Sequence, residues 1–190
     1  MNRKLLAAAA IVILLIGGAL AIGNAFLSTA PASEVTYTPP PSAVHASLGK
    51  TATSGALALR LNGLSDASNP AMSNAWIRFN REAASSGVYN RSLTPPPGDQ
   101  YLIANVTVTN VQRAQIPFTH AAFVLLTPNN TAYYANYAVC SRSCAAQALD
   151  NRTLNEAFSS DVYVLFSVPV GTHAEKIVYT TSNPPIVLST

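Results

Sequence analysis

The sequence predicts an all-β protein, built as a single antiparallel β-sandwich of about seven strands that follows an N-terminal hydrophobic helix. Half of the 190 residues (49%) are apolar and only 10% are charged, which excludes a disordered chain. Segments in which every second residue is apolar recur along the chain, as in strands with one buried face. The 13 prolines and 9 glycines supply turns between these segments.

The first element is an uncharged apolar run, Leu5–Ile22, which follows Arg3 and Lys4. Its 18 residues form a helix of roughly 27 Å, close to the thickness of the hydrocarbon core of a bilayer. A cleaved signal peptide and a retained membrane anchor both fit this run, and a buried core helix fits it less well. Small residues that suit cleavage follow at 23–25 and 30–32. The positive-inside rule places the chain after Ile22 outside the membrane.

Three parts of the chain are expected. Residues 1–27 are the signal peptide or anchor, 28–48 are a Pro/Ser/Thr-rich linker, and 49–190 are the sandwich domain. The linker contains Pro39-Pro40-Pro41, and proline-rich chain is stiff and extended. It is therefore either a spacer that holds the domain away from the membrane or a tail without a role.

Within the domain, the clearest strand is 101–109, whose inner face carries Leu102, Ala104, Val106 and Val108. Further strands are predicted over 56–62, 122–126, 132–137, 162–168, 176–180 and 186–188. Residues 127–130 (Thr-Pro-Asn-Asn) predict a tight hairpin turn, because Asn tolerates positive φ.

Two stretches do not follow the strand pattern. The alternation disappears over 65–98, where Trp76, Ile77 and Phe79 predict a flap that packs over the core; a contact surface is the weaker alternative. Residues 145–154 fit a short helix.

Two strand sequences carry a family resemblance. Residues 101–110 (YLIANVTVTN) and 123–133 (FVLLTPNNTAY) resemble immunoglobulin-like domains of unknown function, found in secreted, lipid-anchored or membrane-anchored bacterial and archaeal proteins. Residues 164–169 and 176–179 are similar to the closing strands of that family. The resemblance covers 49–62 and 101–188; it implies an immunoglobulin-like sandwich and brings no catalytic residues. The chain departs from the family in lacking a lipid-anchoring Cys and in its long stretch over 136–160.

The two cysteines, Cys140 and Cys144, are the only ones in the chain. Outside the membrane an even number of cysteines favours a disulfide. Free thiols are the next alternative. A metal site is the weakest, because His120 and His173 are distant in sequence.

Four Asn-x-Ser/Thr sequons occur, at Asn90, Asn105, Asn129 and Asn151. Their number is close to chance, but Asn129 falls at the predicted hairpin tip, and Asn90 and Asn151 fall in loops. We expect glycosylation if the source is an archaeon or a eukaryote. Asn105 lies in mid-strand, where a sugar fits only if that face is open.

The charge and histidine patterns argue against several function classes. Arg3 and Lys4 belong to the targeting segment, so the rest of the chain carries 9 Lys and Arg against 8 Asp and Glu. This balance makes no basic patch, and we expect no nucleic-acid partner. No triad, carboxylate pair or glycine-rich phosphate loop is present in the sequence, so we expect neither an enzyme nor a cofactor.

The leading hypothesis is a non-enzymatic module outside the cytoplasm, secreted or membrane-anchored at the cell surface, which binds a protein or another cell-surface partner. The N-terminal segment would contact the membrane if it is retained. The alternative is a subunit of an extracellular filament, in which a segment such as 35–38 adds a strand to a neighbouring copy.

Overall fold

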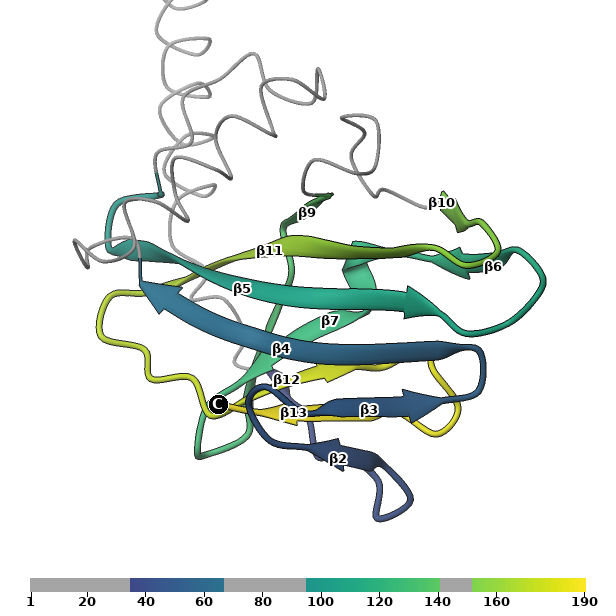
Figure 1. Ribbon diagram of the computed structural model, residues 1–190. Coiled ribbons are helices and arrows are strands. Elements are labelled where there is room, and N and C mark those ends of the chain that lie inside the picture. The colour runs from purple at the N-terminus through teal and green to yellow at the C-terminus, as the bar shows by residue number, and fades with distance from the viewer. Residues whose placement is uncertain (1–34, 67–94, 141–151) are drawn as a thin grey trace, which may run out of the picture. The chain divides into compact units, whose positions relative to one another are not determined.

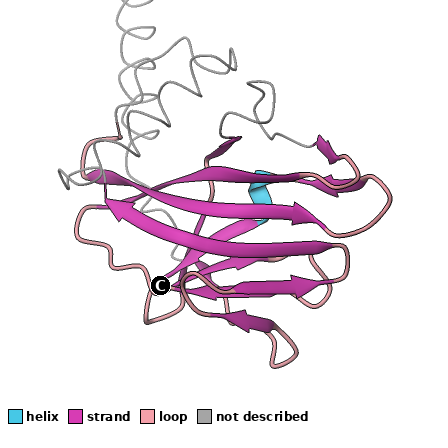
Figure 2. Cartoon of the chain, viewed as in Figure 1, coloured by secondary structure: helices cyan, strands magenta, loops and turns pink. Residues whose placement is uncertain are grey.

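The computed structural model describes residues 35–66, 95–140 and 152–190, and Val35–Thr190 form one compact unit. These residues are strands, turns and one short 3-10 helix, η2 (His120–Ala122), as Figure 2 shows. The predicted all-β class is confirmed. No helix within the described ranges is long and apolar enough to cross a membrane, and the N-terminal hydrophobic helix predicted from Leu5–Ile22 lies outside them.

One layer is an antiparallel five-stranded sheet. Its order is β3 (Thr51–Ser54), β4 (Leu57–Asp66), β5 (Asp99–Asn110), β11 (Ser159–Pro169) and β9 (Tyr137–Cys140). The pair β5–β11 is its centre and runs without interruption from Asp99 opposite Pro169 to Thr109 opposite Ser159. In Figure 1 β4, β5 and β11 cross the front of the domain, and β7, β12 and β13 lie behind them.

The second layer is a six-stranded sheet. Its order is β1 (Val35–Thr36), β8 (Thr131–Tyr134), β7 (Phe123–Leu126), β12 (Lys176–Tyr179), β13 (Ile186–Ser189) and β2 (Val44–Ala46). The pair β13–β2 is parallel, which differs from the antiparallel sheets that we expected. A separate two-stranded ladder joins β6 (Ile116–Phe118) to β10 (Arg152–Leu154).

The core lies between the two layers and follows the predicted alternation. The inner positions of β4, β5 and β11 are buried in one cluster with inner residues of β7, β12 and β13, such as Phe123, Leu125 and Ile177. The predicted turn is also confirmed: Asn130 has φ of 60° and its N–H donates to the carbonyl of Thr127 at 2.9 Å.

The described part of the chain contains thirteen strands, so the expected number of about seven is too low. The missed strands include β1, β2, β3, β6 and β10, which have two to four residues each. Such lengths are too short to show a period of two. The predicted helix over 145–154 is wrong at its end, because Arg152–Leu154 pair with β6 as a strand; 145–151 lie outside the described residues.

The segment expected to be a linker enters the sandwich at Val35. We call residues 35–46 the strap. It begins as β1 beside β8 at one edge of the six-stranded sheet and ends as β2 beside β13 at the other edge. Between them Tyr37 and Ala43 pack on the outer face of the sheet.

The outer face under the strap is apolar, and we call it the strap face. It consists of Val124, Leu126, Ala132, Val178 and Val187, each at most 7% exposed. The sequence contains the signal for this cover, because Phe123–Leu126 and Ile186–Leu188 are continuous apolar runs. Such runs are typical of strands that are buried on both faces.

Candidate functional site

A cavity of about 720 Å³ lies at one end of the sandwich. It is lined by the β3–β4 turn, by β6 with the residue after it, by β10, and by the end of β12 with the loop that follows. Its lining residues are Ser54–Leu57, Ile116–Thr119, Thr153, Tyr179 and Thr181–Asn183. None of them is an acid, a base or a histidine.

An aromatic cluster forms the inner wall of this cavity. The rings of Phe118 and Tyr179 are stacked with centroids 5.5 Å apart and planes 14° apart. Phe123 meets both edge-on, at 5.8 Å from Phe118 and 4.9 Å from Tyr179. Aromatic pairs in these geometries stabilise each other, so Phe123 supports the two rings that line the cavity.

Tyr179 brings a hydroxyl group to the apolar wall. Burial raises the pKa of Tyr179, and hydrogen bonds with the side chain of Thr181 and the backbone of Thr119 oppose the rise only in part. The phenol therefore stays neutral at physiological pH. It is suited to hydrogen bonding and unsuited to acting as a base.

Asn110, at the end of β5, holds one side of the cavity in position. Its side chain is 2% exposed and its Nδ2 donates to the carbonyl oxygens of Ala114 (2.8 Å), Asn155 (2.9 Å) and Leu154 (3.2 Å). Its Oδ1 accepts from the N–H of Gln112 at 2.9 Å. These bonds fix the β5–β6 loop against the end of β10. The loop leads directly into β6, and β6 and β10 both carry lining residues.

Two further contacts fix the opposite side. The hydroxyl of Ser54 donates to the carbonyl of Pro184, which ties the β3–β4 turn to the β12–β13 loop. The hydroxyl of Thr180 donates to the carbonyl of Ala122 at 3.1 Å. Gly55 lies between these walls with φ of +57°, a conformation that side-chain-bearing residues rarely adopt. The walls of this cavity come from four segments that are separated in the chain, so no local sequence pattern indicates it.

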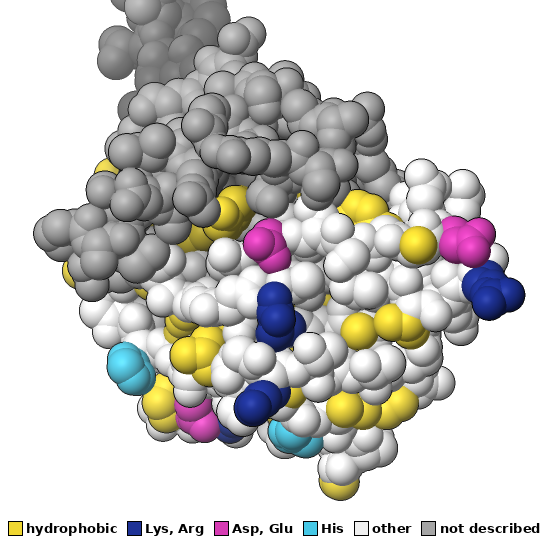
Figure 3. Space-filling view, in the orientation of Figure 1, with side chains coloured by type: hydrophobic (Ala, Val, Ile, Leu, Met, Phe, Trp, Pro, Cys, Tyr) yellow, Lys and Arg dark blue, Asp and Glu magenta, His cyan; other side chains and the backbone are white. Residues whose placement is uncertain are grey.

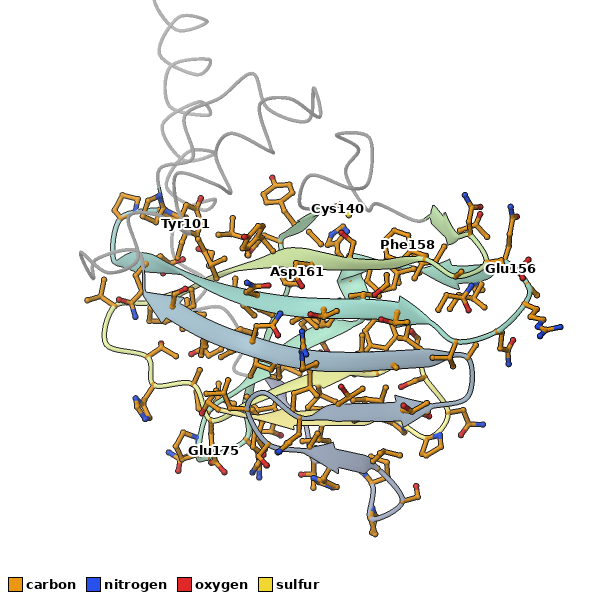
Figure 4. The ribbon with its side chains drawn as sticks, viewed as in Figure 1. Tyr101, Cys140, Glu156, Phe158, Asp161 and Glu175 are labelled. Atoms are coloured by element: carbon orange, nitrogen blue, oxygen red, sulfur yellow. The ribbon has the colours of Figure 1, made fainter. Side chains whose placement is uncertain are left out.

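Apart from the cavity, a group of polar side chains covers part of the outer face of the five-stranded sheet. We call Arg60, Asn62, Asn105, Thr107 and Asp161 the polar network. Thr107 Oγ1 donates to Asp161 Oδ1 at 2.6 Å, and Asn62 Nδ2 donates to Thr107 Oγ1 at 2.9 Å. Asp161, labelled in Figure 4, lies near the start of β11, opposite Thr107 of β5. Figure 3, which looks onto this side, shows few charged side chains on a mainly uncharged polar surface.

Two of the four predicted glycosylation sites lie in the described residues. Asn129 is exposed in the β7–β8 turn, as predicted. Asn105 is half-buried in the polar network, and its Oδ1 accepts from Asn62 Nδ2 at 3.3 Å. Asn90 and Asn151 lie outside the described residues. Glycosylation of all four stays a prediction.

Cys140 ends β9 and is 2% exposed, with its Sγ 3.3 Å from Ser160 Oγ. Cys144 lies outside the described residues, so the disulfide between the two stays a prediction. Trp76, Ile77 and Phe79 also lie outside them.

The three histidines belong to separate elements: His45 to β2, His120 to η2 and His173 to the β11–β12 loop. Within the described ranges, no three His, Cys, Asp or Glu side chains form a group that could hold a metal ion.

Comparison with solved structures gives matches that span most of the chain. The secreted protein MPT63 of Mycobacterium tuberculosis is 11% identical, covers 80% of this chain and 100% of its own length, and has a TM-score of 0.51. An uncharacterised β-sandwich protein of Clostridium difficile is 10% identical over 82% of this chain and 99% of its own, with a TM-score of 0.48. The YjhA protein of Bacillus subtilis is 16% identical over 75% and 97%, with a TM-score of 0.47.

An identity this low shows the fold alone, and the match to MPT63 indicates that the two proteins share a general fold. No curated protein matches the chain. Residues 47–186 match the family described as "Domain of unknown function (DUF4352)". This match spans more than half of the chain and nearly all of the sandwich, and the chain therefore belongs to the DUF4352 family.

Proposed function

We propose that this protein is a non-enzymatic binding module outside the cytoplasm, either secreted or membrane-anchored, and that its end cavity receives an uncharged apolar group of a protein partner. The single observation that carries the binding proposal is the composition of the cavity. It combines a stacked aromatic wall with hydroxyl and backbone groups at its rim, and it has no ionisable lining residue except Tyr179.

The physical argument is one of desolvation. A charged group that entered this cavity would lose its hydration and find no counter-ion, which is costly. An apolar side chain loses no hydration energy there and gains about 25 cal/mol for each Å² of apolar surface that it buries. Thr119, Thr153, Thr181 and Asn183 offer hydroxyl, amide and backbone partners for the peptide groups next to that side chain.

The cellular location rests on different observations. The basic residues Arg3 and Lys4 precede the apolar run Leu5–Ile22, a pattern that directs the following chain across a membrane. MPT63, whose solved structure matches this chain with a TM-score of 0.51, is described as secreted.

The position of the cavity also supports a binding role, because loops at the ends of β-sandwiches are common binding sites.

The test uses blocked tripeptides, acetyl-Ala-X-Ala-amide, in which X is Phe, Leu, Asp or Lys. They are titrated into the isotope-labelled protein, and the amide signals of Thr119, Thr153 and Thr181 are followed by NMR. We expect the Phe and Leu peptides to shift these signals and the Asp and Lys peptides to leave them unchanged. Equal shifts with the charged peptides, or none with any peptide, would reject the proposal.

A pair of variants localises the binding. Thr153→Trp places a large ring at the rim of the cavity and is expected to abolish the shifts of Thr119 and Thr181. Thr51→Trp introduces the same ring on β3 at an exposed position that does not line the cavity, and is expected to leave them intact. Similar behaviour of the two variants would move the binding site elsewhere.

The filament alternative requires strand addition by a segment such as 35–38. In the structure Val35 and Thr36 pair with β8 of their own chain, and the N–H of Tyr37 donates to the carbonyl of Asn130 at 3.0 Å. A filament of this kind therefore needs the segment to leave its own sheet first.

A further inference from the structure

We propose that the strap face is an interface between copies of this chain, and that its occupant is the strap of a second copy. This inference is independent of the proposed cavity function. It concerns the whole strap, residues 35–46, and the apolar face and sheet edges that the strap covers.

The strap covers three surfaces that favour association when they are exposed. Its central part covers the strap face, which is formed by five apolar side chains that are nearly fully buried. Its first strand covers the edge of β8 and its last strand covers the edge of β13. Exposed apolar patches and open strand edges are the two surface features that most readily recruit another chain.

The strap is held by few interactions. β1 pairs through two residues and β2 through three, and two further backbone bonds extend these pairings, from the N–H of Tyr37 to Asn130 and from the N–H of Val44 to Pro185. Between them Tyr37 and Ala43 are its only apolar side chains packed on the strap face, and three consecutive prolines there have no N–H to donate. Val35, which begins β1, is 45% exposed. Local opening costs least where buried contacts and backbone bonds are few, and this is the case for the strap.

The length of the strap leaves no room for a different route within the chain. From Thr36 to Val44 there are eight residue steps, which reach at most about 26–29 Å. The two edge strands are separated by five strand spacings of about 4.8 Å, or about 24 Å. The strap therefore crosses the face directly, and a strap that leaves it has no second place on its own sheet.

A second copy is the occupant because only the strap is known to fit all three surfaces together. Every copy carries the same segment, and each contact that forms within one chain can form between two. Such an exchange costs little in contacts, since the same ones are made, and it is a common route from monomers to dimers. The turn that follows β2, with Gly49 at φ of +75°, connects the strap to the rest of the sandwich and is the place where its direction would change.

The experiment joins one copy's strap to another copy's sheet. Val35 lies opposite Ala132 in the β1–β8 pair, a separation that suits a disulfide. Ala132 is only 7% exposed, so a cysteine there reacts chiefly with a group seated on β8. The full chain with Val35→Cys is mixed in mild detergent with a differently tagged full chain that carries Ala132→Cys. After incubation and oxidation, mixed disulfides are identified by non-reducing electrophoresis and peptide mass spectrometry.

We expect a mixed dimer linked through positions 35 and 132, several-fold more abundant than in a control that mixes Val35→Cys with Thr53→Cys. Thr53 is exposed on β3 of the other sheet, so that control measures chance encounters. A third variant carries both cysteines in one chain. It tests whether positions 35 and 132 can form a disulfide, since its own strap can close the bond within the monomer. The proposal is overturned if this variant forms its disulfide but the mixed dimer is no more abundant than in the control.

A readout without new cysteines guards against variants that misfold. Parent chains with two different tags are mixed at high concentration, diluted, and assayed for co-purification of one tag with the other. We expect mixed oligomers that form with time and increase with concentration. Only unmixed monomers at every concentration would also overturn the proposal.

Discussion

The two sheets of this sandwich treat their outer faces differently. On the six-stranded sheet the outer face is apolar from β8 to β13 and is covered by the strap. On the five-stranded sheet, part of the outer face carries the polar network, whose side chains bond one another across three strands. An apolar outer face requires a cover, whereas a polar one can meet water directly.

A third region lies between these extremes. Ile103 on β5 and Leu165 on β11 are opposite each other and point outward, yet they are 1% and 0% exposed. They lie on the same face as the polar network, further toward the start of β5. This part of the face is thus buried like the strap face, and substitutions in the three regions should differ in cost.

The largest effect is expected at Ile103. Ile103→Ala should cost about 2–5 kcal/mol of unfolding free energy, as large-to-small changes at fully buried sites do. Thr109→Ala, on the same face of the same strand, should change it by less than about 0.5 kcal/mol. Denaturant unfolding measures both, and equal small effects would mean that Ile103 is not effectively covered.

Trp76 provides a second readout in the same pair of variants. It is the only tryptophan of the chain, and the sequence predicts that it packs over the core. If it covers Ile103, its emission should shift to longer wavelength and become more accessible to acrylamide in Ile103→Ala but not in Thr109→Ala. Unchanged emission in both variants would argue for a different cover.

Reciprocal substitutions compare the centres of the two faces. Val178→Thr places a hydroxyl under the strap and should cost about 1–3 kcal/mol, because the buried group lacks a ready partner. Thr107→Val removes the central hydroxyl of the polar network, which water can partly replace, and should cost less than about 1 kcal/mol. Thermal unfolding at matched pH measures the two costs. A reversed order would show that the network matters more than the covered face.

The strap itself is tested at Tyr37. Tyr37→Ala removes its large cover residue and should cost about 1–2 kcal/mol, less than full aromatic truncation because the ring is only partly buried. Tyr137→Ala is the matched control, because Tyr137 is 38% exposed on β9 of the other sheet. Hydrogen exchange of the β8 and β13 amides should quicken in the first variant only. Equal exchange in both variants would mean that Tyr37 does not hold the strap.

The smallest effect is expected from alkaline pH. Burial, and then the neighbouring Tyr134, raise the pKa of Tyr37 above its ordinary value of 10.0. A raised pKa means that the neutral phenol is favoured in the folded state, so its contribution is complete below pH 10 and is lost as pH rises through the folded value. Tyr37→Phe should therefore weaken the loss of stability above that pH, whereas Asp161→Asn should not. The same alkaline slope in all three proteins would contradict this assignment.

The sequence predicted the long elements of this fold and missed the short ones for a physical reason. Strands β4, β5 and β11 bury one face each over ten or more residues, so their alternation is visible. β1 and β2 are placed by pairing with β8 and β13, which are distant in the chain. The prolines between β1 and β2 predict a stiff segment. This pattern is the same for a free linker and for a segment that lies on a sheet.

The cavity could not be predicted for a related reason. Asn110 was part of a strand sequence that resembled a known family, but its role depends on carbonyl groups of 114, 154 and 155, which only the fold brings together. Tyr179 and Phe118 likewise stand in unremarkable strand sequences. Sequence patterns describe which face of a strand is buried, and they do not describe which segments meet at its end.

The direction of β7 has a practical consequence for handling this protein. Phe123, at the start of β7, packs against the two aromatic rings that line the cavity, while Leu126, at the end of β7, accepts the N–H of Glu175 and lies beside Ala132. Val35 pairs with Ala132, and the N–H of Thr190 donates to the carbonyl of Glu175 at 3.0 Å. Residues 35 and 190 therefore both emerge at the end of the sandwich that faces away from the cavity. A fusion partner, an affinity tag or a surface linker attached through either residue leaves the cavity open to the solution.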